Sequence, residues 1–394
     1  MPTPDDICPR PDELPPQTTQ PHSAPIYLTS VWRCDDPRQA DDMLGGRTPG
    51  YVYQRDGHPN ADLFAEKCRE LHHAERAAIT SSGMAALSLA LLSQLRTGDH
   101  VVASRNLYGK SLLLLGTEAA RVGIACSTAD TCDLSTTAAA FTPQTKLVVV
   151  ETIANPLLQV ADIAALAELC HARGAKLLVD NTFATPVLCQ PLTLGADFVL
   201  ESVSKMMNGH SDVMLGLLCG RAADWERVPV ALSAWGLASS PFDAWLSSRG
   251  LATLHLRMDR ACDNALRAAE FLSHQPAVAR VDYPGLPRHP HHALAARQCG
   301  GRFGSIVTFH LAAGRAAAEA FIRAARRIPF CPSLGEVSTT LSHPESTSHR
   351  ALTPDQRAAL GITGGTIRLS LGAESSAFVC DALAEGLRGM RIVP

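Results

Sequence analysis

The sequence predicts an α/β fold, with a mainly parallel sheet covered by helices on both faces and a smaller C-terminal α+β domain. Short, nearly continuous apolar runs such as "KLVVVE" and "KLLVD" alternate with helical stretches such as "DIAALAELCHARG". Strands that are apolar on both faces are typical of parallel sheets that lie between helices. After about residue 250 the pattern changes and a long amphipathic helix begins, which predicts the second domain.

The bulk composition also favours two domains and disfavours nucleic-acid binding. The chain has 394 residues, 46% of them hydrophobic, and is too long for one simple core. We expect an N-terminal arm that contacts a partner subunit at residues 1–60, a large domain at 61–250 and a small domain at 251–394. The 35 Lys and Arg residues are balanced by 38 Asp and Glu residues, so no basic excess indicates a nucleic-acid partner.

The N-terminal segment does not resemble a targeting or membrane segment. Residues 1–25 are rich in proline and lack the basic start and apolar core of a signal peptide. No apolar run approaches the roughly 20 residues that span a bilayer, so we expect no membrane partner. The 12 cysteines are scattered without metal-type spacing, which is typical of reduced thiols and favours a cytoplasmic location. The "HPHH" at residues 289–292 has no cysteine or carboxylate at ligand spacing, so no metal is predicted.

The expected elements follow from local patterns along the chain. Residues 26–60 are rich in Asp, Gly and Pro and cannot build a core alone, so we expect contact with something else to order them. Helices are expected where apolar residues recur at helical spacing or follow small capping residues, and strands where short β-branched runs occur. The expected helices are 62–74, 81–95, 162–174, 251–275 and 316–328, the expected strands are 99–105, 146–151, 176–180, 197–202, 304–311 and 366–372, and residues 280–292 are expected to form a loop.

Chemically distinctive residues follow successive strands. In open α/β sheets, ligands bind beyond the carboxyl ends of the strands, so residues at these ends face one crevice. The lysine of "ESVSKMMNGHSD" follows a buried strand, and burying its charge is costly unless it is paired or neutralised. The residues at these strand ends are Ser82, Gly83, Met84, Tyr108, Asn155, Asp180, Ser202, Ser204 and Lys205.

This combination matches the requirements of a pyridoxal 5'-phosphate site. Lys205 can form the Schiff base, and Asp180 can keep the pyridine nitrogen protonated so that the ring accepts electrons. The helix that begins near Gly83 can bind phosphate through its backbone N–H groups and its dipole. Each residue alone has an ordinary explanation, since Asp180 could cap a turn and Lys205 could lie on the surface. Their order at successive strand ends favours the cofactor site.

The chain resembles the Cys/Met-metabolism family of pyridoxal-phosphate enzymes, the cystathionine γ-lyase, cystathionine γ-synthase and methionine γ-lyase group of fold type I. The resemblance covers nearly the whole chain after about residue 25. The segments around Lys205 and in "RGLATLHLRM" are the most specific. The motifs that carry it are "YVYQRDGHPN", "SSGMAA", "NLYGKS", "ETIANP", "VDNTF", "SVSKMMNGHSDV", "SPFDAWLSSRGLATLHLRM", "YPGLPRHP", "PSLG" and "IRLSLG".

The resemblance implies a role for each matching residue. Lys205 is the Schiff-base lysine, Asp180 pairs with the pyridine nitrogen, and Tyr108 stacks on the ring and assists proton transfer. Arg368 grips the substrate carboxylate, a task that suits a bidentate guanidinium. Asn155 lies near the ring hydroxyl and Ser333 beside the carboxylate site. The phosphate contacts implied are Ser82, Gly83, Met84, Ser202 and Ser204 of the same chain, with Tyr53 and Arg55 from the neighbouring subunit of a homotetramer built from two dimers.

The resemblance also implies the reaction, with its details open. We expect γ-elimination or γ-replacement on a γ-substituted L-amino acid of the cystathionine or O-acylhomoserine type, as in transsulfuration. An O-acetylhomoserine sulfhydrylase, replacement with another nucleophile, a cystathionine β-lyase and a catalytically inactive scaffold subunit are the alternatives. Lys110 stands where methionine γ-lyases carry cysteine, which argues against that activity. Glu336 and Ser338 also depart from the family pattern, in a segment expected to border the distal substrate pocket.

Overall fold

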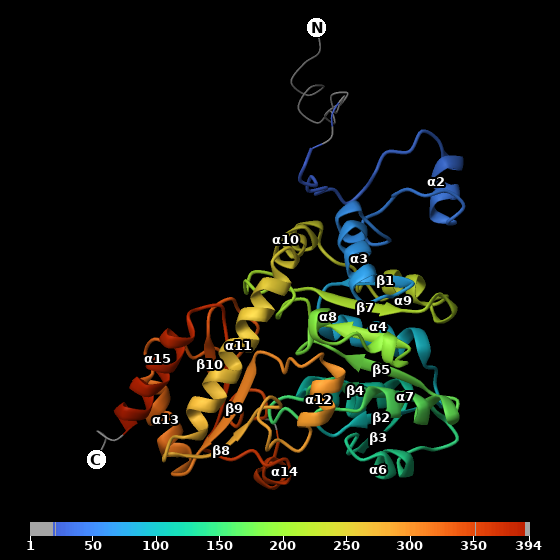
Figure 1. The fold of residues 1–394 in the computed structure, drawn as a ribbon. Helices are drawn as coiled ribbons and strands as arrows, with labels where there is room; N and C mark the ends of the chain where they lie inside the picture. The colour runs from blue at the N-terminus through green and yellow to red at the C-terminus, as the bar shows by residue number, and fades with distance from the viewer. Residues whose placement is uncertain (1–18, 20, 351, 391–394) are drawn as a thin grey trace.

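The computed structural model describes residues 19, 21–350 and 352–390, so most of the arm expected at residues 1–25 lies outside the described residues. The described chain forms a seven-stranded sheet with helices on both faces and a separate four-stranded antiparallel sheet (Figure 1). Both features confirm the fold class predicted from the sequence. The proposed domain limits at residues 60 and 250 stay predictions.

The large sheet has the strand order β1-β7-β6-β5-β4-β2-β3. Strands β6, β5, β4, β2 and β3 pair in parallel, whereas β7 is antiparallel to both β6 and β1. The carboxyl ends of the parallel strands therefore meet at one edge, where ligands bind in such sheets. The strands are β1 (Arg76–Thr80), β2 (His100–Ser104), β3 (Ala125–Ala129), β4 (Thr145–Glu151), β5 (Lys176–Asp180), β6 (Phe198–Glu201) and β7 (Gly216–Gly220).

Alternate side chains of the central strands enter cores on opposite faces of the sheet. Val148 and Val150 of β4 belong to one cluster of buried residues, whereas Leu147 and Val149 belong to the other. This period of two explains why the strands read as continuously apolar in the sequence. The helices and short helical turns of this region are α3 (Pro59–Leu71), α4 (Gly83–Gln94), α5 (Gly109–Leu113), η1 (Leu114–Glu118), η2 (Ala119–Val122), α6 (Leu134–Ala139), α7 (Ile163–Ala172), α8 (Thr185–Leu188), η3 (Pro191–Leu194), η4 (Ala222–Asp224), α9 (Val228–Ala234) and α10 (Pro241–Leu251).

The small sheet has the order β10-β11-β9-β8 and is antiparallel throughout. The long helix α11 runs from the large sheet along the small one in Figure 1. Phe309 of β9 meets Phe321 of α13 edge to face, with ring centroids 5.4 Å apart. The elements are α11 (Leu254–Ser273), β8 (Val278–Asp282), α12 (His292–Gln298), β9 (Ile306–Leu311), α13 (Gly314–Ala324), β10 (Thr340–Ser342), α14 (Pro354–Ala359), β11 (Thr366–Ser370) and α15 (Ser376–Gly389).

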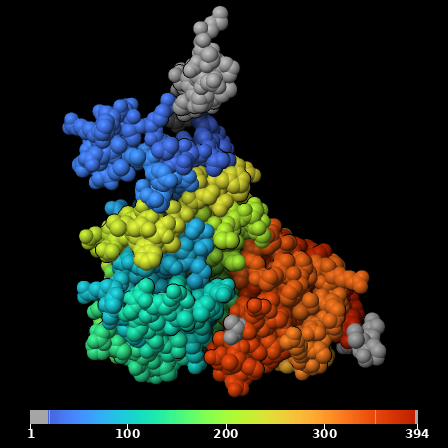
Figure 2. Space-filling view, turned by 180° about the vertical axis from the view of Figure 1, so that it is seen from behind, coloured from blue at the N-terminus to red at the C-terminus, as the bar shows by residue number. Residues whose placement is uncertain are grey.

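The structure contains further elements that the sequence analysis did not predict, and it differs from the predictions in several places. The loop expected at residues 280–292 begins as the end of β8, a strand whose exposed residues hide its character in the sequence. Strands β3 and β7 had not been predicted. In the arm, α2 (Pro37–Leu44) is capped by Asp36 but has no buried residues. Figure 2 shows the residues around α2, in blue, as a protrusion from the body of the molecule. Among the described residues, no helix combines the length and the apolar character needed to cross a membrane.

Candidate active site

A cavity of about 550 Å³ lies at the carboxyl ends of the strands of the large sheet and also contacts the small sheet. Its walls bring together residues that are far apart in the sequence, from α4 to β11. Nearly all the predicted site residues line it. These are Ser82, Gly83, Met84, Tyr108, Asn155, Asp180, Ser202, Ser204, Lys205, Ser333 and Arg368.

Lys205 lies in the turn after β6 and extends into this cavity. Its Nζ donates a hydrogen bond to Oγ of Ser333 over 2.9 Å. Burial lowers the pKa of Lys205, and the nearby guanidinium of Arg368 lowers it further. Both effects shift the side chain toward the neutral amine relative to an exposed lysine. A neutral amine is the form that reacts with an aldehyde and accepts protons.

Asp180 is the last residue of β5 and is held by the turn that follows. The backbone N–H and the hydroxyl of Thr182 both donate to Oδ1 of Asp180, over 3.0 and 2.6 Å. Burial raises the pKa of Asp180, while these two hydrogen bonds lower it. Oδ1 is thus fixed by Thr182, which leaves Oδ2 available to a positively charged partner in the cavity.

The start of α4 forms the end of the cavity that is suited to a phosphate. Oγ of Ser82 accepts a hydrogen bond from the N–H of Ala85 and caps the helix, which leaves the N–H groups of the first turn pointing outward. A Cβ at Gly83 would lie 2.8 Å from Cβ of Ser202, so only glycine allows the loop after β6 to approach the helix this closely. Ser204 was expected to contact the phosphate. Its hydroxyl exchanges hydrogen bonds with the backbone N–H and carbonyl oxygen of Leu215, which the sequence analysis did not predict. The backbone N–H groups at the start of α4 remain as donors that fit a phosphate group.

The substrate end of the cavity is built from both sheets. Nη1 of Arg368, on β11, donates to Oδ1 of Asn155 over 2.8 Å, and Nη2 donates to the carbonyl oxygen of Ser333 over 2.9 Å. Its Nε is buried and has no hydrogen-bond partner within the described part of the chain. Such an unsatisfied charged donor is costly and suits an anionic ligand such as a carboxylate.

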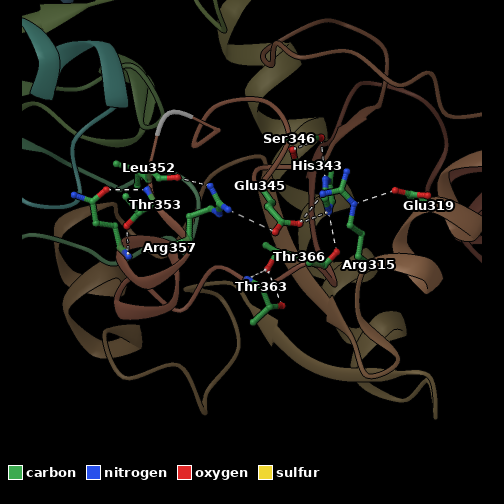
Figure 3. A network of polar contacts seen from close by, with 12 residues as sticks. Arg315, Glu319, His343, Glu345, Ser346, Leu352, Thr353, Arg357, Thr363 and Thr366 are labelled. Carbon is green, nitrogen blue, oxygen red and sulfur yellow. Dashed lines mark hydrogen bonds and ion pairs between the residues drawn. The ribbon is translucent and has the colours of Figure 1, made fainter.

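A loop of the small domain borders the same cavity. Ser348 lines the cavity. Figure 3 shows the polar contacts of His343 and Glu345, which precede it in the chain. Glu345 lies between Arg315 and Arg357, with oxygen–nitrogen distances of 3.6 and 3.9 Å. Nε2 of His343 donates to the carbonyl oxygen of Gly364 over 2.8 Å. These contacts fix the loop to the small sheet and so fix the place of Ser348.

Some predicted residues lie outside the cavity. Tyr53 and Arg55 do not line it, and the Arg55 guanidinium instead lies 5.1 Å from the centroid of the Tyr53 ring. Glu336 and Ser338 do not line it either, although Pro332, Ser333 and Leu334 of the same segment do. Gly335 has a φ of +84°, and Glu336 lies beside Arg257 in a separate small hollow behind the cavity. The direction of this turn depends on packing that the sequence does not reveal.

Sequence reasoning missed several residues of the cavity. Glu151, Thr182, Phe183, Met214 and Ser348 line it but were not among the candidates. Glu151 is the last residue of β4, directly paired in the sheet with Asp180 of β5. The signal was present in the sequence, because a carboxylate ended each of two successive apolar strands, but only the second was singled out.

Comparison with known proteins agrees with this geometry. The family model described as Cys/Met metabolism PLP-dependent enzyme matches residues 10–388. An O-succinylhomoserine sulfhydrylase of Pseudomonas aeruginosa is 41% identical over 94% of this chain and 91% of its own. An L-methionine gamma-lyase of Porphyromonas gingivalis is 38% identical over 93% of this chain and 92% of its own.

A solved structure has the same fold over nearly the same length. The cystathionine gamma synthase of Xanthomonas oryzae pv. oryzae, in complex with cystathionine, is 39% identical and covers 94% of this chain and 93% of its own, with a TM-score of 0.89. The family match spans both sheets and every residue of the cavity described above. The chain therefore belongs to the Cys/Met-metabolism family of pyridoxal-phosphate-dependent enzymes.

Proposed function

We propose that this enzyme catalyses γ-replacement or γ-elimination on a γ-substituted L-amino acid of the cystathionine or O-acylhomoserine type. The observation that carries the proposal is the convergence of Lys205, Asp180, Tyr108 and Arg368 on one cavity. Names of similar proteins support the substrate class, because methionine, cystathionine and O-succinylhomoserine all carry their substituent on Cγ. The alternative of a catalytically inactive scaffold subunit is disfavoured, because the residues needed for catalysis are all present.

The chain's residues divide the work of binding and proton transfer. Bound pyridoxal phosphate supplies an aldehyde that links to amines and a ring that withdraws electrons from the substrate's Cα. Asp180 holds a proton on the ring nitrogen, and the N–H groups at the start of α4 bind the phosphate. Arg368 binds the substrate's α-carboxylate and so orients the Cα–H bond toward Lys205.

Proton transfer then falls to Lys205 and Tyr108. Burial and Arg368 lower the pKa of Lys205, so its amine can accept the α proton and return it to a neighbouring carbon. The exposed phenol of Tyr108 lies at the cavity wall, where it can stack on a ring and pass a proton to the leaving group. Once the γ substituent has left, either water or an added nucleophile completes the reaction.

The choice among reactions depends on the open end of the cavity. Lys110, two residues after Tyr108, is exposed and stands where methionine γ-lyases carry cysteine, which argues against methionine as the preferred substrate. We place a cystathionine γ-lyase or γ-synthase type of reaction first, and an O-acylhomoserine sulfhydrylase second. The homotetramer, the contribution of Tyr53 and Arg55 to a neighbouring site, and the cytoplasmic location stay predictions.

A product screen tests the proposed function. The purified, cofactor-loaded enzyme would be given cystathionine, an O-acylhomoserine or methionine, each with and without an added thiol or cysteine. A product that contains the added thiol indicates replacement, whereas a 2-oxo acid with ammonia indicates elimination. If no γ-substituted amino acid yields either product while the cofactor is bound, the proposal is wrong.

A further inference from the structure

Glu151 occupies the central position at the cavity edge of the large sheet. Its strand, β4, lies between β2 and β5. The loop after β2 carries Tyr108, the loop after β4 carries Asn155, and Asp180 of β5 is the direct neighbour of Glu151 in the sheet. Glu151 is buried and lines the cavity. None of the roles proposed above uses this carboxylate.

Each oxygen of Glu151 accepts a hydrogen bond from a different loop. The backbone N–H of Tyr108 donates to Oε1 over 2.6 Å, and the backbone N–H of Asn155 donates to Oε2 over 3.1 Å. Backbone N–H groups can only donate, so both oxygens must act as acceptors, as they do in an ionised carboxylate. An amide in this place could offer only one acceptor.

These two bonds begin a chain of contacts that crosses the whole site. From Asn155, the chain continues to Arg368 through Oδ1, then to the carbonyl oxygen of Ser333. The hydroxyl of Ser333 in turn accepts from Nζ of Lys205. Glu151 therefore links the loop of Tyr108 to the residues that hold the substrate and the cofactor.

Keeping the carboxylate of Glu151 ionised in this buried position costs free energy. Burial raises the pKa of Glu151, and the negative charge of Asp180 raises it too, while the two N–H donors lower it and favour the ionised form. A glutamine would avoid the charge but lose one of the two acceptors. A costly buried group at a functional site is a reason to look for a role there.

We propose that Glu151 is a positioning residue that fixes the loops of Tyr108 and Asn155 together in the geometry the cofactor requires. It acts through their backbones and does not touch the reacting atoms. The inference rests on the roles proposed for Tyr108 and Asn155. Glu151 therefore supports the geometry of the active site and does not serve the general stability of the large sheet.

Hydrogen exchange of backbone amides, followed by mass spectrometry on the cofactor-loaded enzyme, tests this inference. In Glu151→Ala, peptides that contain Tyr108 and Asn155 should exchange about 10-fold to 100-fold faster, the expected loss for hydrogen bonds to a charged group. In Glu151→Gln, one of the two peptides should keep its protection, because one acceptor oxygen remains. The affinity for pyridoxal phosphate should fall at least about 10-fold in Glu151→Ala.

Asp197→Ala provides a matched control for Glu151→Ala. Asp197 is also a buried carboxylate that accepts a backbone hydrogen bond, from the N–H of Leu177 over 2.8 Å, but it lies at the opposite end of β5 and β6. This variant should lose protection around Leu177 and keep it around Tyr108 and Asn155.

Three results would overturn the inference. The first is unchanged protection of both loops in Glu151→Ala and Glu151→Gln. The second is a loss of protection that spreads equally to the peptide of Leu177, since Glu151 would then support the sheet as a whole. Exchange needs no substrate, so a failed product screen leaves this result interpretable. Lost protection with unchanged cofactor affinity would contradict the roles of Tyr108 and Asn155 and, with them, the inference.

Discussion

Arg368 of the small sheet and Asn155, in the loop after β4 of the large sheet, are joined by a hydrogen bond of 2.8 Å between Nη1 and Oδ1. The second amino group of Arg368 is held by the carbonyl oxygen of Ser333 over 2.9 Å. The guanidinium is thus oriented by both sheets, with Nε left without a protein partner among the described residues. The carboxylate site exists only when the two sheets are correctly placed relative to each other.

Replacing Arg368 with lysine should weaken substrate binding more than it slows the chemical step. Lysine keeps a positive charge but loses the planar fork that grips a carboxylate at two points. We expect KM to rise about 10-fold to 100-fold, the value of a charge-assisted hydrogen bond, with a smaller fall in kcat. Steady-state kinetics at saturating cofactor measure both. Arg280→Lys, an exposed arginine on β8 of the same sheet, should leave KM unchanged, and equal KM values for both variants would contradict the assignment.

Lys205 should be the residue that links covalently to the cofactor. Its Nζ reaches Ser333 inside the cavity, and burial lowers the pKa of Lys205, so the neutral amine is available. Borohydride reduction followed by peptide mapping should place the label on Lys205, and Lys205→Ala should abolish both label and turnover. Lys176→Ala, which removes a partly buried lysine that pairs with Asp224, should keep the label. A label on any other lysine would show that the central assignment is wrong.

His349 should make the protein sensitive to acid. Burial, together with the charge of Arg368, lowers the pKa of His349 from 6.5 to about 4. Between these two values the unfolded state binds more protons at this site than the folded state, so stability falls as the pH falls. The slope from one such group is at most about 1.4 kcal/mol per pH unit.

His349→Gln should make this dependence shallower. Urea unfolding of wild type and variant at several pH values between 6.5 and about 4 measures the two slopes. The variant should lose less stability than the wild type over this range, whatever its stability at neutral pH. Two parallel curves would mean that His349 has the same pKa in the folded and the unfolded protein.

The parts of the site that were predictable from sequence are those that depend on local order along the chain. Lys205 and Asp180 each follow an apolar strand, and parallel strands bring their carboxyl ends together whatever the exact register. Glu151 also ends an apolar strand, but it was missed because its role depends on the register of β4 and β5, which pairs it directly with Asp180. The direction of Glu336 depends on the turn at Gly335, and the anchoring of Ser348 depends on Glu345 and its distant arginines. Such long-range packing leaves no local pattern.

The arm around Arg55 should complete the active site of a neighbouring subunit. Arg55 lies over the half-exposed ring of Tyr53 and does not line the cavity of its own chain. The preceding helix α2 has no buried residues, so the arm lacks a core of its own. If Arg55 binds a neighbour's cofactor phosphate, Arg55→Ala should weaken cofactor retention by about 10-fold or more.

Mixed oligomers test this sharing directly. Arg55→Ala and Lys205→Ala subunits, carrying different tags, would be reassembled and the mixed species purified. One site of each mixed dimer would then combine an intact Lys205 with an intact arm from the other chain, so activity should return. A mixture of Lys205→Ala with Asp180→Asn should stay inactive, because both residues line the same cavity of one chain. If the first mixture assembles but regains no activity, Arg55 serves its own subunit and the site is not shared.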